Sequence, residues 1–449
     1  MQYYSLERRS PAVDFRTATI RGQAPDRGLY FPERIPSMEP GFLAALRAQT
    51  LPGQTPSDQT PPGQTLRAAS LPEIGAAVLA PFTEGSLPES ALESILEDAL
   101  SFDIPLVPLS EDCSVLELFH GPTLAFKDVG ARFMSRCLGY FSGDPVTVLV
   151  ATSGDTGGAV ASGFDGVKGV KVVILYPKGK VSPVQELQLT TCGENVSALE
   201  VEGTFDDCQR MVKEAFADAA LMDRVRLTSA NSINVARWLP QQVYYWWAYR
   251  QWTHPEPPVF VVPSGNFGNI CAGLLAYHMG MPAGHFLAAT NANDTVPRFM
   301  QTGTMDPHPA VATLSNAMDV ALPSNFGRIL ELFAQKETPL GAKVSSVSLG
   351  DAATVQAMRD LYRIHGYVAD PHTAVGYAAW ETYRKTHPGT KAILLSTAHP
   401  VKFAPTIEQA LGIHLELPEP VRALYGLPAR KTRMGTDYTE LKAYLLGEG

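Results

Sequence analysis

The chain has 449 residues, of which 45% are apolar and 18% charged, enough apolar sequence for about three structural units with buried cores. A formal net charge of −9 excludes a general nucleic-acid partner, which would need a basic face. Neither a signal-peptide core nor a run of ~18 apolar residues is present, so we expect a cytoplasmic protein without a membrane partner.

The cysteines indicate free thiols. They are five, an odd number, widely spaced and without a CxxC pair, and no HExxH motif is present; the positions are Cys113, Cys137, Cys192, Cys208 and Cys271. This pattern predicts reduced side chains and no structural or catalytic metal.

The N-terminal region, up to about residue 95, contains a stretch of low complexity. Residues 51–67 read LPGQTPSDQTPPGQTLR and have almost no large apolar side chains, which predicts an exposed, flexible insert. A helix follows, because Leu92, Ile95 and Leu96 repeat at helical spacing behind a Ser90–Glu93 capping-box pattern.

Downstream, short apolar segments alternate with helical patterns. The segments suit strands buried on both faces; they are 115–119, 146–151, 170–176, 259–263 and 392–396. Helices are indicated behind a Thr204 cap, before a stop at Gly366, and after Asp370 with proline in the first turn. This alternation predicts an α/β fold with largely parallel sheets.

Lys127 is the first candidate for chemistry. It follows the segment 115–119 and a His-Gly-Pro-Thr turn, and it lies near the start of a predicted helix, next to Phe126 and Val129. A helix N-terminus and apolar neighbours both disfavour an ammonium ion, so they favour a neutral amine of the kind that forms a Schiff base. A surface lysine after a turn is the ordinary alternative, and for a lone lysine it is favoured.

Two glycine-rich turns follow other predicted strands. Ser153-Gly154-Asp155-Thr156-Gly157 comes after 146–151, and Gly265-Asn266-Phe267-Gly268-Asn269 comes after 259–263. Hydroxyl and amide donors at a helix start suit a carboxylate or a phosphate. The second turn lacks the Lys-Ser/Thr of a P-loop and the three glycines of a dinucleotide fold. A capped helix without a ligand explains the first turn about equally well. For the second turn the alternative is an ordinary tight turn between a strand and a helix.

Two weaker candidates lie elsewhere. Thr397 ends the segment 392–396 with a hydroxyl that could bond a ring nitrogen, although such hydroxyls commonly cap local turns. Asn234 and Arg237 precede an aromatic helical stripe, and arginine with amide donors suits phosphate recognition. The stripe itself is more typical of a core.

The order of these motifs resembles the fold-type II pyridoxal-phosphate enzymes and, more narrowly, the threonine synthases. The similar segments include 22–32 (GQAPDRGLYFP), 120–128 (HGPTLAFKD), 313–319 (TLSNAMD), 370–374 (DPHTA) and 396–400 (STAHP). Two departures are the insert at 51–67 and Arg27, which stands where glycine is expected.

The resemblance implies a fold with a large and a small domain, both built from mostly parallel sheets with flanking helices. The expected units are an N-terminal domain at 1–95, a large cofactor domain at 96–135 and 235–449, and a smaller inserted domain at 136–234.

The resemblance also implies roles for the candidate residues around pyridoxal 5'-phosphate. Lys127 would carry the cofactor as a Schiff base and act as the catalytic base. The other expected cofactor contacts are Phe126, Asp155 near the ring 3'-oxygen, Gly265, Asn266, Phe267, Gly268, Asn269, and Thr397 at the ring nitrogen. The expected substrate contacts are Ser153, Gly154, Thr156 and Gly157, with Asn234 and Arg237 at the substrate phosphate.

The implied activity is threonine synthase, which converts O-phospho-L-homoserine and water to L-threonine and phosphate in the last step of threonine biosynthesis. Two alternatives stay open. Another fold-type II lyase or dehydratase could act on a hydroxy- or phospho-amino acid, or a non-catalytic relative could bind a phosphorylated metabolite. Whether the protein is a monomer or a dimer does not follow from the sequence.

Overall fold

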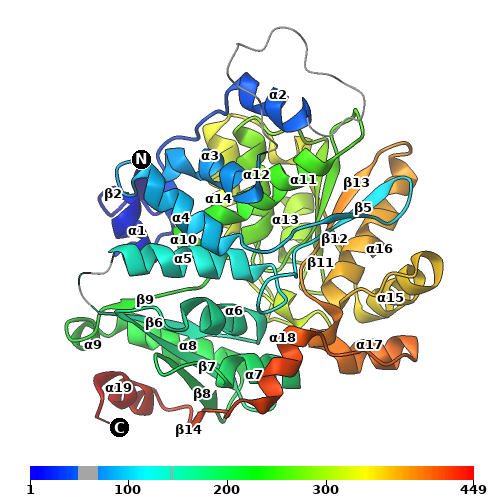
Figure 1. Ribbon diagram of the computed structural model, residues 1–449. Helices are drawn as coiled ribbons and strands as arrows, with labels where there is room; N and C mark the ends of the chain where they lie inside the picture. The colour runs from blue at the N-terminus through cyan, green and yellow to red at the C-terminus, as the bar shows by residue number, and fades with distance from the viewer. Residues whose placement is uncertain (49–68, 142, 144, 449) are drawn as a thin grey trace.

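The computed structural model describes residues 1–48, 69–141, 143 and 145–448, so the insert expected at 51–67 lies outside the described residues. Three sheets organise the chain (Figure 1). The smallest is antiparallel, in the order β2 (Val13–Asp14), β1 (Gln2–Ser5) and β3 (Tyr30–Pro32). Helices α1 (Phe15–Arg21), α2 (Pro40–Ala48), α3 (Leu71–Thr83) and α4 (Glu89–Ala99) complete the N-terminal region.

The six-stranded sheet is parallel except at one edge. Its order is β12 (Val344–Ser348), β11 (His285–Thr290), β10 (Val259–Pro263), β13 (Ala392–Ser396), β5 (Cys113–Glu117) and β4 (Leu106–Pro108), and β4 runs antiparallel to β5. Its helices are α11 (Gln242–Gln251), α12 (Gly268–His278), α13 (Thr295–Thr302), α14 (Phe326–Gln335), α15 (Asp351–His365), α16 (Pro371–Thr386) and α17 (Ala404–Leu411). Helices α15 to α17 lie on one side of this sheet and α11 and α12 on the other (Figure 1).

The five-stranded sheet is entirely parallel. Its order is β14 (Thr432–Met434), β8 (Val196–Val201), β7 (Val170–Pro177), β6 (Val146–Ala151) and β9 (Leu227–Thr228). Its helices are α5 (Lys127–Phe141), α6 (Asp155–Phe164), α7 (Pro183–Thr190), α8 (Phe205–Ala217), α9 (Ala219–Met222) and α19 (Tyr438–Leu446). The remaining short elements are α10 (Val235–Trp238), α18 (Glu419–Arg422), η1 (Leu239–Gln241), η2 (Asn316–Met318), η3 (Leu340–Ala342), η4 (Pro400–Phe403) and η5 (Ala423–Gly426).

Helices cover both faces of each large sheet, and successive side chains of a strand point to opposite faces, so both sets of side chains are buried. In β10, Val259 and Val261 belong to the core under α15 and α16, whereas Phe260 and Val262 belong to the core that contains α11 and α12. This alternation explains why each of these strands reads as a continuous apolar segment. The predicted α/β fold with mostly parallel sheets is confirmed.

The predicted elements need three corrections. Strand β5 begins and ends two residues before the predicted 115–119, because the chain turns away once Leu118 N–H has bonded the Ser396 carbonyl. The Ser90–Glu93 capping box does not form, since α4 begins at Glu89 behind Pro88 and no side chain caps it. The C-terminal strand β14, expected within the large domain at 235–449, instead pairs with β8 of the five-stranded sheet.

The rest of the domain division stays a proposal. Other local signals agree with the structure: Thr204 caps α8, Gly366 ends α15 in a left-handed conformation, and Asp370 caps α16 with proline in its first turn. Among the described residues, none of the helices combines the length and apolar character that crossing a bilayer requires.

Candidate active site

A cavity of about 1350 Å³ lies where the carboxyl ends of strands from both large sheets meet. Its walls contain residues that follow β5, β6, β10 and β13, so the fold brings all four candidate turns to one place, as parallel sheets commonly do with ligand-binding loops. The predicted residues on the walls are Phe126, Lys127, Ser153, Asp155, Thr156, Arg237, Gly265, Asn266, Phe267, Gly268, Asn269 and Thr397.

Lys127 is the first residue of α5 and reaches into this cavity. Its side chain is 16% exposed, and its Nζ lies 3.8 Å from Asp155 Oδ2 and 5.0 Å from the centre of the Phe126 ring. Burial lowers the pKa of Lys127, and the nearby Asp155 carboxylate opposes this shift only in part. The pKa of Lys127 is therefore lowered, as expected for a lysine that forms a Schiff base, and burial is the main cause.

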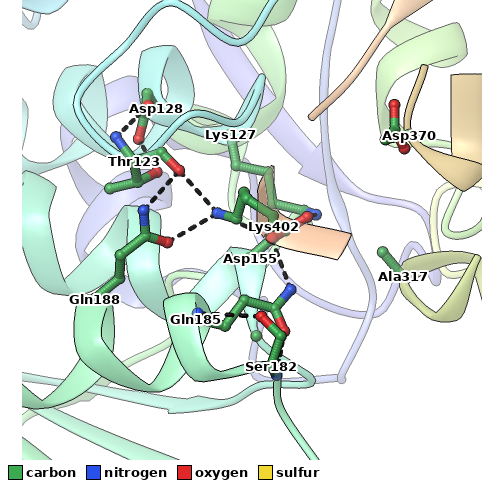
Figure 2. Close-up of polar contacts among 12 residues, drawn as sticks. Thr123, Lys127, Asp128, Asp155, Ser182, Gln185, Gln188, Ala317, Asp370 and Lys402 are labelled. Atoms are coloured by element: carbon green, nitrogen blue, oxygen red, sulfur yellow. Dashed lines mark hydrogen bonds and ion pairs between the residues drawn. The ribbon is translucent and has the colours of Figure 1, made fainter. Parts of the chain in front are cut away.

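Asp155 is a buried carboxylate between two lysines (Figure 2). Its Oδ1 accepts a hydrogen bond from Gln185 Nε2 at 2.9 Å and lies 3.0 Å from Lys402 Nζ. Burial alone would raise the pKa of Asp155, but Lys402, Lys127 and the bond from Gln185 hold it below its usual range. Asp155 is therefore an ionised group in the wall of the cavity.

The glycines of the first turn shape the loop. Thr152 Oγ1 accepts hydrogen bonds from the backbone N–H groups of Gly154 (2.9 Å) and Gly157 (2.8 Å). These two N–H groups are therefore not available to an anion, contrary to the expected role of Gly154 and Gly157 in substrate binding. Ser153 and Thr156 do line the cavity at the N-terminus of α6. The first N–H groups of a helix lack intrahelical partners and favour anions.

The second turn lies across the cavity, where α12 begins at Gly268. Gly265 packs so closely against η2 that an added Cβ would lie 2.6 Å from Met318 Cα. Asn266 is held by hydrogen bonds from its Nδ2 to Ser232 Oγ (2.7 Å) and from Ser324 N–H to its Oδ1 (2.6 Å). The loop is thus fixed by packing and side-chain bonds before any ligand binds.

Arg237 and Asn234 differ in what they offer. Both Nδ2 hydrogens of Asn234 are used by the carbonyls of Thr19 (2.9 Å) and Ser229 (3.2 Å), and Asn234 is not on the cavity wall. The structure therefore gives Asn234 the role of a helix cap and not that of a phosphate ligand. Arg237 is on the wall and donates from Nη1 to the Ala230 carbonyl, while its Nε has no partner among the described residues. Burial lowers the pKa of Arg237 to about 10.

His372 is a cavity residue to which the sequence reasoning assigned no role. Its Nε2 accepts a hydrogen bond from the Ala317 N–H at 3.2 Å, so its proton lies on Nδ1, which donates to Asp370 Oδ1 at 2.7 Å. Asp370 is fully buried and also accepts from the Thr373 hydroxyl. This pair fixes the orientation of the His372 ring beside Asp319 and Thr397.

Lys402 and Gln185 are also functional candidates that sequence reasoning missed. Lys402 has no distinctive motif around it, although a lysine among the apolar residues of η4 is unusual and is the one available signal. Gln185 is recognisable only as a partner of Ser182 in a capping box at the start of α7, which gives no hint of its bond to Asp155.

The residues present fit pyridoxal phosphate. The cavity wall carries polar side chains that suit a polar ligand; they are Ser153, Thr156, Asn231, Arg237, Gln241 and Asn269. Lys127, whose pKa is lowered, lies on the same cavity as the N-terminus of α12. An amine of this kind suits the aldehyde of the cofactor, and a helix N-terminus suits its phosphate. Within the described part of the chain, no cluster of three or more histidine, cysteine or acidic residues could hold a metal.

Three family models match the chain. A model described as pyridoxal-phosphate dependent enzyme matches residues 107–397, one described as threonine synthase N terminus matches 2–100, and one described as threonine synthase, C-terminal matches 373–445. Together they span nearly the whole sequence.

Relatives and solved structures agree with these models. Threonine synthase from Serratia marcescens is 41% identical over 450 residues, covering 100% of this chain and 99% of that protein. The crystal structure of threonine synthase from Escherichia coli superposes with a TM-score of 0.90 at 40% identity, covering 100% of both chains. A pyridoxal-phosphate-bound threonine synthase from Brucella melitensis gives a TM-score of 0.88 at 34% identity, with 100% and 99% coverage.

Proposed function

The chain belongs to the threonine synthase family of pyridoxal-phosphate-dependent enzymes, and on this premise we propose that it converts O-phospho-L-homoserine and water to L-threonine and phosphate. The observation that carries the proposal is the cavity, which combines a buried amine at Lys127 with anion-binding donors on opposite walls. A phosphorylated amino acid presents two anions and an amine, which match these groups.

We propose that Lys127 anchors the cofactor, and that the loop of Gly265 to Asn269 binds its phosphate at the start of α12. Phe126, Asp155 and Thr397 complete the walls around its ring. When bound, pyridoxal phosphate supplies an electron sink for carbanions at the substrate.

The protein's own groups bind and orient the substrate and move its protons. Ser153, Thr156 and the N-terminus of α6 suit the carboxylate, and the Arg237 side chain on the cavity wall is the candidate donor for the phosphate. The lowered pKa of Lys127 keeps its Nζ available to accept a proton.

We further propose a cytoplasmic location, because all five cysteines are free thiols. The oligomeric state stays open between a monomer and a dimer.

The test is to incubate the purified protein with O-phospho-L-homoserine and to measure phosphate and threonine together. Equal amounts of both are expected. Phosphate with a keto acid and ammonia in place of threonine would move the protein to the lyase or dehydratase activity, and neither product would remove the substrate assignment.

Replacing Lys127 by alanine should abolish threonine formation, because this change removes the amine that anchors the cofactor and accepts the proton. Lys168, an exposed lysine on the loop before β7, provides the matched control, and its alanine variant should retain full turnover. Normal turnover in the Lys127 variant would overturn the assignment.

A further inference from the structure

Lys402 is a second lysine close to Asp155; it is fully buried and lies behind the cavity wall. It lies in η4, directly after the strand end that carries Thr397. Its Nζ donates to the Thr123 carbonyl at 2.8 Å and to Gln188 Oε1 at 2.9 Å, and it lies 3.0 Å from Asp155 Oδ1. Three oxygen atoms therefore fix the position of its ammonium group (Figure 2).

These contacts also determine how the Asp155 carboxylate is shared between Lys402 and Lys127. Gln188 is itself held in place by the bond from its Nε2 to the same Thr123 carbonyl at 3.0 Å. Lys402 and Gln185 both bind Oδ1 of Asp155, which leaves Oδ2 directed towards Lys127 at 3.8 Å. The carboxylate is thus bound tightly on the side of Lys402 and loosely on the side of Lys127.

We propose that Lys402 is a positioning residue that binds and neutralises Asp155, so that the amine of Lys127 is not held as an ammonium ion by that carboxylate. The inference rests on the proposed role of Lys127 as the cofactor anchor. It assigns Lys402 no contact with cofactor or substrate.

The physical basis is the competition of two cations for one buried anion. An opposite charge within ~4–6 Å stabilises the charged form of a group, and a like charge destabilises it. With Lys402 present, Asp155 is paired and the ammonium of Lys127 gains little. Without Lys402, Asp155 would keep Lys127 as its only close cation, and the protonated amine would be stabilised.

The other charged groups near Lys127 and Asp155 have smaller effects on Asp155 than Lys402 has. Arg237 and Asp370 act on Lys127 in opposite directions, Arg237 lowering its pKa and Asp370 raising it. His372 faces Asp155 from α16 and contributes less than either lysine. Lys402 is therefore the cation whose removal changes the environment of Asp155 most.

The test measures the protonation of Lys127 directly in the full-length chain freed of cofactor. Trace acetylation with acetic anhydride from neutral to alkaline pH, followed by mass spectrometry of the Lys127 peptide, gives the pH at which the amine becomes reactive. Exposed Lys168 serves as the internal reference. Because the readout is independent of turnover, absence of threonine formation and failure of this inference are distinguishable.

The two single variants should move the labelling of Lys127 in opposite directions. Lys402→Met should shift its midpoint to higher pH, and a shift of one unit lowers labelling near neutral pH about tenfold. Asp155→Asn should shift the midpoint to lower pH and increase labelling. In the double variant no carboxylate remains for Lys402 to neutralise, so its profile should stay close to that of Asp155→Asn.

Unchanged profiles, or shifts of both single variants in the same direction, would overturn the proposal. A buried charge without its partner is strongly destabilising, so Lys402→Met could fail to fold. In that case Asp155→Asn alone must still increase labelling, and the double variant must fold and label like Asp155→Asn. If the double variant instead returns to the wild-type profile, Lys402 acts on Lys127 by direct repulsion and not through Asp155.

Discussion

Replacing Arg328 by methionine should destabilise the protein by about 3–5 kcal/mol, the usual cost of removing one member of a buried charged network. Arg328 is fully buried in α14, and its guanidinium lies 4.5 Å from the Trp238 ring centre. It donates to the carbonyls of Tyr30 (3.2 and 3.1 Å), Ser232 (3.0 Å) and Ile233 (2.6 Å), and to Asn325 Oδ1 (2.7 Å).

The magnitude follows from these four acceptors. A hydrogen bond from a charged donor contributes roughly 1.5–3 kcal/mol, and a buried acceptor left without a donor costs about 1–3 kcal/mol. Desolvation of the guanidinium offsets several kcal/mol of the gain, and the same burial lowers the pKa of Arg328 to about 10. Methionine keeps the apolar contact and none of the bonds, so a net loss near the middle of the range is expected.

Urea unfolding followed by circular dichroism measures this loss. Arg384 provides the matched control, since its guanidinium is 42% exposed and pairs with Asp112 and Glu381; its methionine variant should lose less than about 1 kcal/mol. Asn325 also bonds the Asn266 carbonyl at 3.2 Å, so the Arg328 variant should bind the cofactor more weakly. A loss below about 1 kcal/mol for the Arg328 variant would refute the reasoning.

Three further outcomes are expected. Arg27 has a φ of +68° and lines the cavity. Arg27→Gly should raise the free energy of unfolding in urea by up to about 1 kcal/mol, because glycine adopts this φ without strain, and it should raise the KM for a phosphorylated substrate. A large loss of stability would contradict this. Gly273→Ala would place a Cβ 2.4 Å from Tyr245 Cε1, so unfolding measurements should show a loss of about 1–3 kcal/mol, and an unchanged stability would contradict the packing. Burial lowers the pKa of His278 and His399 to about 4, below the ~6.5 of an unfolded histidine, so unfolding takes up protons and stability should fall as pH drops from about 6.5 towards 4. Melting temperatures across this range should fall less steeply for His278→Phe, and an equally steep fall would exclude this histidine as a contributor.

Strands and turns with continuous local signals were predictable. Strands β6, β10 and β13 lie where the sequence placed them, because both of their faces are apolar. Strand β12 reads VSSVS and β11 reads HFLAAT, and neither has the β-branched run that made the others visible. Their place in the sheet comes from neighbouring strands.

The site divides in the same way. Lys127 was predictable because turn, helix start and apolar neighbours are adjacent in sequence. Lys402 was not, since its partner Thr123 lies 279 residues earlier in the chain. The sequence predicts a ligand contact for Asn234 because an asparagine that binds an anion and one that caps a helix have the same local sequence pattern. Only the hydrogen bonds of Asn234 to the Thr19 and Ser229 carbonyls distinguish the two roles.

The pairing of β14 with β8, visible in Figure 1 as red beside green, affects how the protein is made. On a ribosome, β8 emerges long before β14, and this edge of the five-stranded sheet stays open while β10 to β13 of the larger sheet are synthesised. An open strand edge is a site for wrong pairing. Strand β5 likewise waits for β13, its partner along Cys113 to Glu117. Chains that stop before β13 should therefore expose the edges of both β5 and β8, and they should aggregate more than chains that reach β14.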